Sequence, residues 1–308
     1  MNGFKLLLLT AALASPAQAQ DASALLADDL RFAEDLARHR YFDLALETVN
    51  GLQAAIAGER DSDLSGEASL TEARISLRQA DSTADLEARR AALTRSIELL
   101  DDWVRPGSPY AYHDRLVDAY QDIASAYRDR GVLLSKLVAE GASGAKDDAV
   151  SDFRAADEAY EKLQEECEAR ADQLESNARE TATEEQLEEA GGDWYSDAAA
   201  RLAMLGYTTY YWRGLNAIEW AEVSDDAEFR IETAIELLDE FTWEVSDQTL
   251  VYYQAMYEQA RALLALGEID DARELCDNLL ELARPMFWAW TFEDGSAGGV
   301  GGLAPRNQ

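Results

Sequence analysis

The chain has 308 residues, of which 61 are Asp or Glu and 27 are Lys or Arg, so its formal net charge is −34 at pH 7. Such a polyanion repels nucleic acid and anionic lipid surfaces, and these two classes of partner are not expected. The charge favours cationic partners, metal ions or a salty medium, or it serves solubility alone. Two cysteines, Cys167 and Cys276, do not make a disulfide scaffold, although they could pair in an exported chain.

Residues 1–19 have the pattern of a signal peptide. Lys5 precedes an apolar run, LLLLTAALA, that is too short to span a bilayer, and SPAQA ends in the small-x-small pattern that signal peptidase cleaves. We therefore expect cleavage after Ala19 and export to the periplasm or the medium. No later stretch is long and apolar enough for a membrane helix, so we expect no integral membrane segment in the mature chain.

The rest of the sequence predicts an all-α protein. Apolar residues recur at intervals of three and four, strand-like alternation is absent, and prolines are scarce between Pro16 and Pro285. In chain order we expect helical repeats over 20–146, one long acidic helical segment over 147–192, aromatic-rich helical repeats over 193–292 and a disordered Gly-rich tail over 293–308.

Paired helices are predicted at both ends of this region. Residues 36–56 carry apolar residues on helical faces on both sides of a break near Arg40. Residues 256–285 show the same order, in which Gly267 ends one helix and Ile269 and Ala272 belong to the next.

The order of Gly267, Ile269 and Ala272 resembles the turn of a tetratricopeptide repeat (TPR), and the matching residues at the first site are Arg40, Phe42 and Ala45. In that family a small residue lets the chain turn, an apolar residue packs beneath the turn, and an alanine allows close helix contact; Arg40 departs from this preference. The resemblance implies helical hairpins that stack into a right-handed α-solenoid, because one hairpin cannot bury its apolar face alone. It also implies a protein-binding module without enzymatic activity.

Two near copies support the repeat. SIELLDDW (96–103) and AIELLDEF (234–241) are each followed by an aromatic-containing helical pattern, at 116–131 and 252–267. The distance from the isoleucine to the closing glycine is 34 residues in one copy (131 − 97) and 32 in the other (267 − 235), which is about one repeat length.

The window DSDLSGEASLTE (61–72) has the ligand spacing of an EF-hand calcium loop. Gly66 would take the sharp turn, and Glu67 would offer its backbone carbonyl. The other ligands would be Asp61, Asp63, Ser65, Ser69 and Glu72. In the alternative interpretation the window is an acidic connector whose Ser69 or Thr71 caps the next helix. Calcium is the one cofactor that the sequence suggests.

The segment 147–189 is predicted to form one long helix with acid-rich faces. Its apolar stripe follows a mean spacing of 3.5 residues, which fits a solvated helix that partly overhangs the repeats or, alternatively, an intermolecular coiled coil. The stripe consists of Phe153, Ala156, Tyr160, Leu163, Cys167 and Leu174.

Aromatic residues crowd the second half, above all in YTTYYWRGLNAIEW (207–220). Such side chains could grip a partner, or they could fill the gaps between helices. The candidate partner-binding residues are Tyr207, Tyr210, Tyr211, Trp212, Arg213 and Trp220.

Catalytic motifs are absent from the sequence. There is no nucleophile elbow, phosphate-binding loop or His-based zinc spacing, and His39 and His113 are the only histidines. We therefore expect an exported, non-enzymatic TPR-like scaffold that binds a protein or peptide with basic residues through an acidic, aromatic-lined concave surface. The alternatives are an α/α-toroid protein that binds or cleaves carbohydrate and a calcium-stabilised structural component of the envelope.

Overall fold

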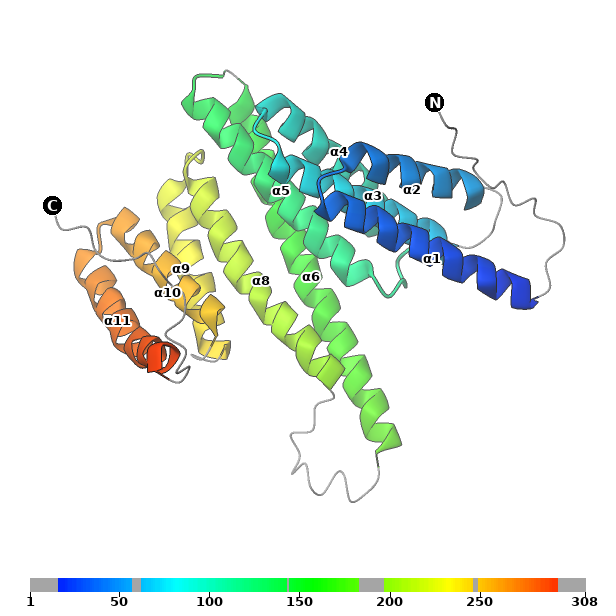
Figure 1. The fold of residues 1–308 in the computed structure, drawn as a ribbon. Helices are drawn as coiled ribbons and strands as arrows, with labels where there is room; N and C mark the ends of the chain where they lie inside the picture. Colours follow the sequence, from blue (N-terminus) through cyan, green and yellow to red (C-terminus); the bar gives the residue numbers. More distant parts are fainter. Residues whose placement is uncertain (1–15, 57–61, 143, 183–196, 246–248, 293–308) are drawn as a thin grey trace. The chain divides into compact units, whose positions relative to one another are not determined.

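The computed structural model describes residues 16–56, 62–142, 144–182, 197–245 and 249–292, with side chains from 27 to 282 apart from Ser62 (Figure 1). Every regular element in these ranges is an α-helix, which confirms the predicted all-α fold. The predicted tail 293–308 lies outside them, as does most of the predicted signal peptide. The helices are α1 (Pro16–Arg38), α2 (Phe42–Ile56), α3 (Ser62–Ser82), α4 (Leu86–Val104), α5 (Leu116–Ala139), α6 (Ala145–Thr181), α8 (Asp197–Ala221), α9 (Ala227–Glu244), α10 (Leu250–Leu266) and α11 (Ile269–Phe292).

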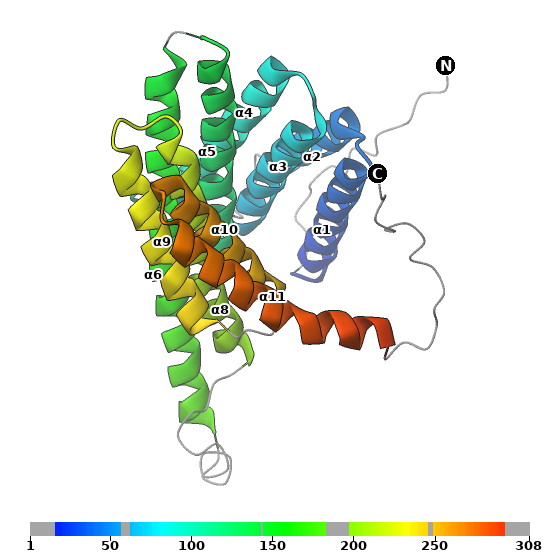
Figure 2. The same ribbon diagram turned by 90° about the vertical axis from the view of Figure 1, so that its left-hand side faces the viewer.

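The chain forms two compact units, Met1–Leu133 and Leu134–Gln308, whose boundary falls within α5. Inside each unit, helices pack against their neighbours in the sequence: α1, α2, α3 and α4 in the first, and α6, α8, α9, α10 and α11 in the second. Figures 1 and 2 show α10 beside α11 and α8 along α6. This packing confirms the predicted helical hairpins. The division predicted at residue 146 stays a prediction.

The turn between α1 and α2 lies where the TPR resemblance places it. Arg40 has a left-handed φ of 64°, and its N–H donates to the Ala37 carbonyl at 3.0 Å. The next N–H, of Tyr41, reaches back to the Leu36 carbonyl at 2.9 Å. Together these two bonds form a Schellman motif, which satisfies carbonyls left over at a helix end.

Two further turns repeat this pattern, around Gly141 (φ 93°) and Gly267 (φ 83°). The N–H of Gly267 donates to Leu264 at 3.1 Å, and the N–H of Glu268 donates to Leu263 at 3.0 Å. Glycine adopts this conformation without strain, whereas Arg40 does so at a cost in free energy.

Residues after the turns match the predicted pattern in part. Ala45 and Ala272 are both buried, at 0% and 1% exposure, and Phe42 packs against the core of its hairpin. Ile269, in contrast, is 58% exposed, so the prediction that it packs beneath the second turn is wrong. The alanine carries the close helix contact at both sites.

The near copies of the sequence occupy equivalent places in α4 and α9. Ser96, Leu100 and Trp103 are buried in α4, as are Ala234, Leu238 and Phe241 in α9. The equivalence continues into α5 and α10, where four aligned pairs are buried: Ala119 and Ala255, Ile123 and Gln259, Ala124 and Ala260, Ala126 and Ala262. We call α3–α4–α5 and α8–α9–α10 the two versions of a three-helix arrangement, because their last two helices share these buried positions. The versions differ in that α5 continues past Gly131 to Ala139, whereas α10 ends at Leu266.

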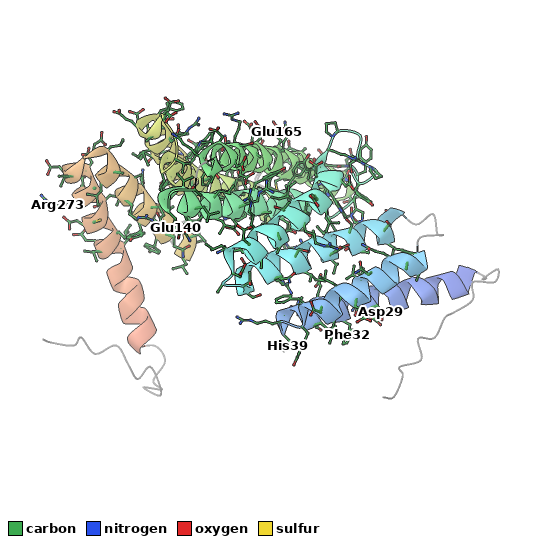
Figure 3. The ribbon with its side chains drawn as sticks, turned by 90° about the horizontal axis from the view of Figure 1, so that it is seen from above. Asp29, Phe32, His39, Glu140, Glu165 and Arg273 are labelled. Carbon is green, nitrogen blue, oxygen red and sulfur yellow. The ribbon has the colours of Figure 1, made fainter. Side chains whose placement is uncertain are left out.

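The long acidic helix exists as α6, which has 37 residues. Its predicted stripe is buried from Phe153 to Cys167, while Leu174 is 37% exposed. The stripe packs against α8 of the same chain, so in this structure it is buried within one chain and not in an intermolecular coiled coil. Acidic residues line the opposite face, where Glu165 pairs with Lys162 at 2.6 Å (Figure 3).

Candidate functional site

The calcium window lies in a helix. Asp61 is outside the described residues, and Ser62–Ser82 is continuous α-helix, so the predicted loop conformation is wrong. Successive helical side chains are rotated by about 100°, so Ser65 lies on the side of α3 opposite Asp63 and Glu67, and the three cannot converge on one ion. Among the side chains that the structure describes, no group of three or more His, Cys, Asp or Glu is placed to hold a metal ion.

The acids of this window instead join helices. Glu72 is 4% exposed and accepts hydrogen bonds from Gln53 Nε2 at 2.9 Å and from Arg95. Glu67 accepts from an Arg115 N–H at 2.9 Å. Calcium binding stays a prediction, and it would compete with these arginines.

Gly66 has a role that the EF-hand pattern did not suggest. A Cβ atom built at this position would lie 3.1 Å from Trp103 Cζ2 and 3.0 Å from Tyr110 Cε1. The Trp103 and Tyr110 rings stack with centroids 4.5 Å apart. Glycine is therefore needed here for the close approach of α3 to this stack, and its φ is not left-handed.

An ion-pair network links α3 to α5 in the first unit. Arg74 contacts Asp122 at 2.6 Å and Asp118 at 3.3 Å, and Arg115 also pairs with Asp118. Burial raises the pKa of Asp122 above its ordinary value, and the negative charge of Asp118 adds to this effect. Arg74 thus bridges the first and third helices of the α3–α4–α5 arrangement.

Three of the candidate aromatic-region residues pack against α6. Gln164 Nε2 donates to the Tyr210 hydroxyl at 3.0 Å, and the Trp212 ring lies 5.7 Å from the Tyr160 ring. Arg213 binds Asp157 through two N–H groups, at 2.8 and 3.3 Å.

Two other candidates pack against α9. The Tyr211 ring lies 5.7 Å from the Phe241 ring, and the Arg230 guanidinium lies 3.5 Å above the Trp220 ring. Tyr207 is the most exposed of the six, at 37%. These contacts correspond to the inter-helix interpretation, and the partner-binding role of the six residues stays a prediction.

The cysteines are both free. Cys167 is buried where α6 meets Gly206 of α8, and burial raises the pKa of its thiol to about 12. Such a thiol is protonated at neutral pH and is a poor nucleophile.

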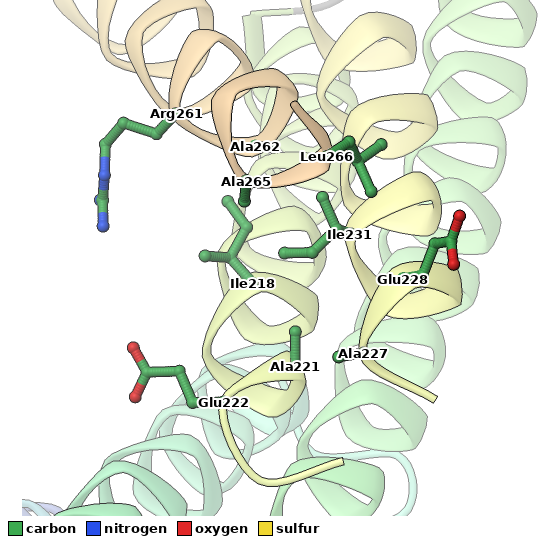
Figure 4. Close-up of a pocket in the computed structure, with 10 residues that line it drawn as sticks. All are labelled: Ile218, Ala221, Glu222, Ala227, Glu228, Ile231, Arg261, Ala262, Ala265 and Leu266. Carbon is green, nitrogen blue, oxygen red and sulfur yellow. The ribbon is translucent and has the colours of Figure 1, made fainter. Parts of the chain in front are cut away.

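A groove of about 590 Å³ opens in the second unit between the last turns of α8 and α10 (Figure 4). The first turns of α9 also line the groove. The floor is apolar and consists of Ile218 and Ala221 from α8, Ala227 and Ile231 from α9, and Ala262, Ala265 and Leu266 from α10. We call it the α8–α10 groove.

Charged side chains surround this floor. Glu222 and Arg261 lie on one side in Figure 4, and Glu228 lies on the other. Just beyond Arg261, the Glu258 carboxylate accepts its guanidinium N–H at 2.5 Å and is only 15% exposed. Two acids and one base thus line the groove, and Glu258 lies on the same side of α10, one turn before Ala262. The carboxyl ends of α8 and α10 add negative helix-dipole charge.

Exposed apolar side chains lie on a neighbouring side of α10, about 100° around the helix from Ala265. Leu250, Tyr257 and Leu264 are 70%, 53% and 54% exposed and follow one another at intervals of seven. Residues seven apart lie on nearly the same side of a helix, so α10 presents one apolar stripe to solvent.

Sequence reasoning did not find the groove. Its floor is made largely of alanines, and the space results from their small size rather than from a motif. The sequence contained only a weak sign of the groove. Ala262 and Ala265 are small residues, and they lie near apolar residues that recur at intervals of seven, namely Leu250, Tyr257 and Leu264.

Comparison with solved structures gives three chains of low sequence identity and low TM-score. The TPR-like repeats of a kinesin light chain protein from Podosopora anserina are 14% identical, with a TM-score of 0.43 over 87% of this chain and 97% of that one. A variant of those repeats is 13% identical, with a TM-score of 0.45 over 86% and 95%. A computationally designed self-assembling cyclic homooligomer is 15% identical, with a TM-score of 0.23 over 87% and 95%.

Family models and curated protein sequences contain no match to this chain. Within the described part of the chain, none of the helices combines the length and the apolar character of a membrane span.

Proposed function

We propose that the chain is a non-enzymatic scaffold whose α8–α10 groove binds a segment of a protein partner. The groove itself carries this proposal: it combines an apolar floor, a charged rim and a volume that accepts several side chains.

A protein segment fits the surface better than a small molecule does. The exposed side chains of Leu250, Tyr257 and Leu264 form a second apolar surface on a neighbouring side of α10. Exposed apolar surface of this kind is typical of interaction sites, and intervals of seven suit an amphipathic helix laid along it.

The charge supports a partner with basic residues. Glu222 and Glu228 line the groove, Glu258 pairs with the lining residue Arg261, and the whole chain carries a net charge of −34. Long-range attraction from such a charge speeds the encounter with a cationic partner. In this proposal the mature chain acts after export, following cleavage behind Ala19.

Selection of peptides from a random display library on the full chain tests the proposal. Ala265 is exposed and lines the groove, so Ala265→Trp should fill the groove without disturbing the core. Ala55→Trp, at an exposed position of α2, is the matched control. We expect Ala265→Trp to lower the affinity for the selected peptides by about tenfold or more, which is the usual range for a hot spot. Ala55→Trp should leave this affinity unchanged. Equal binding to both variants would refute the groove as the binding site.

A further inference from the structure

We infer that the partner segment inserts an arginine or lysine that pairs with Glu258. In the first unit, Arg74 of the same chain fills this role for the aligned carboxylate, Asp122. This inference rests on the proposed function and specifies the chemistry of the occupant. It follows from comparing the two versions of the three-helix arrangement.

The carboxylates of the two versions occupy the same position. Asp122 lies nine residues before Gly131 (131 − 122), and Glu258 lies nine residues before Gly267 (267 − 258). Each is followed by a buried residue and then a buried alanine, so both helices present the same face to the core. Both carboxylates are largely shielded from water, with side-chain exposures of 21% for Asp122 and 15% for Glu258.

The cations of the two versions differ in origin. Asp122 pairs with Arg74 of α3, the helix that precedes the near copy in α4. The corresponding helix in the second unit is α8, and the side chains that it places in the groove are Ile218, Ala221 and Glu222. None of these is basic, so no groove residue of α8 reaches across to Glu258.

Glu258 is instead paired with Arg261 of its own helix, one turn further on. Arg261 is 52% exposed, so water and salt weaken its pairing with Glu258. Arg261 also lines the groove, so the guanidinium that pairs with Glu258 lies beside the apolar floor. A partner cation can therefore displace Arg261 while the partner's apolar side chains cover Ile218 and Ala265.

The test uses a fluorescein-labelled peptide from the library selection and measures its affinity for the full chain by anisotropy. We expect Glu258→Gln to weaken binding by about five- to thirtyfold, as for loss of a partly buried charged hydrogen bond. Arg261→Gln should strengthen binding several-fold, because it removes the competing cation. Glu236→Gln, at an exposed position of α9, is the control and should have no effect.

A second measurement shows whether the peptide cation meets Glu258. Replacing the peptide's arginine by citrulline, which keeps its shape but not its charge, should weaken binding to the wild type as much as Glu258→Gln does. The two losses should not add when combined, because both remove one interaction.

Additive losses, weaker binding to Arg261→Gln, or selected groove-dependent peptides without Arg or Lys would each overturn the inference and leave the proposed function standing. Peptides that bind equally well to Ala265→Trp would overturn both. Ile218→Arg, which adds a basic side chain to the α8 side of the groove, should also weaken binding. Its melting curve by circular dichroism verifies that it folds.

Discussion

Gly214 lies in the middle of α8 at the point where α8 meets α9, and its replacement by alanine tests the closeness of that contact. A Cβ atom at this position would lie 2.8 Å from Leu238 Cγ and 2.9 Å from Leu238 Cδ2. Leu238 is fully buried and packs among Tyr210, Tyr211 and Phe241, so it has little freedom to move away.

Two opposing effects set the magnitude. Alanine stabilises a helix interior by about 1 kcal/mol relative to glycine, whereas overpacking a tight core costs about 1–3 kcal/mol. We therefore expect Gly214→Ala to destabilise the protein by about 1 kcal/mol. Gly51→Ala is the matched control, because Gly51 is an exposed helical glycine with no atom within 4 Å of its added Cβ, and it should gain up to about 1 kcal/mol.

Urea denaturation followed by circular dichroism measures both changes. The decisive experiment adds Leu238→Ala, which removes the two atoms that the new Cβ would meet. In that background Gly214→Ala should stabilise by about 1 kcal/mol, so the sign of its effect reverses. If Gly214→Ala stabilises the wild type as much as Gly51→Ala does, α8 and α9 are not in close contact and the reasoning is refuted.

Three other expectations follow from single contacts. Arg40→Gly should raise the free energy of unfolding by about 1 kcal/mol, and Gly267→Ala should lower it by a similar amount, because both positions have a left-handed φ. Urea midpoints equal to that of the wild type would contradict this. Burial raises the pKa of Asp122, so the folded state holds its proton more tightly than the unfolded chain does. The stability of the wild type relative to Asp122→Asn should therefore fall as the pH rises above about 4, and a relative stability that grows with pH would be the opposite result. Millimolar calcium should leave the melting temperature unchanged relative to chelator, because ion pairs already engage Glu67 and Glu72; a rise of several degrees would restore the calcium site.

Helical periodicity made much of the fold predictable. The stripe from Phe153 to Cys167 and the aligned apolar positions of 96–103 and 234–241 report burial directly, because a residue that recurs every three to four positions faces the same neighbour. The turn at Gly267 was equally readable, since the left-handed position favours glycine.

The candidate sites were less predictable, because they depend on contacts between distant residues. Ligand spacing in the window 61–72 counts positions along the chain, but it does not show whether the chain turns there or continues as a helix. The buried Leu70 and Ala73 favour the helix, since residues three apart give α3 an apolar face. Likewise, the aromatic residues of α8 were visible in the sequence, but their neighbours on α6 and α9 decide which of them are covered.

The arginines of this acidic chain show why the groove differs from other helix contacts. Arg74, Arg95, Arg115 and Arg213 each pair with an acid on another helix, so these scarce cations hold the helices together. Arg261 pairs within its own helix and joins nothing across the groove. A shielded carboxylate whose cation comes only from its own helix is a place where a cation from outside can add a contact that the fold does not already make. In the proposal made above, the acid that Arg74 neutralises in the first unit therefore corresponds, in the second, to a site for a partner.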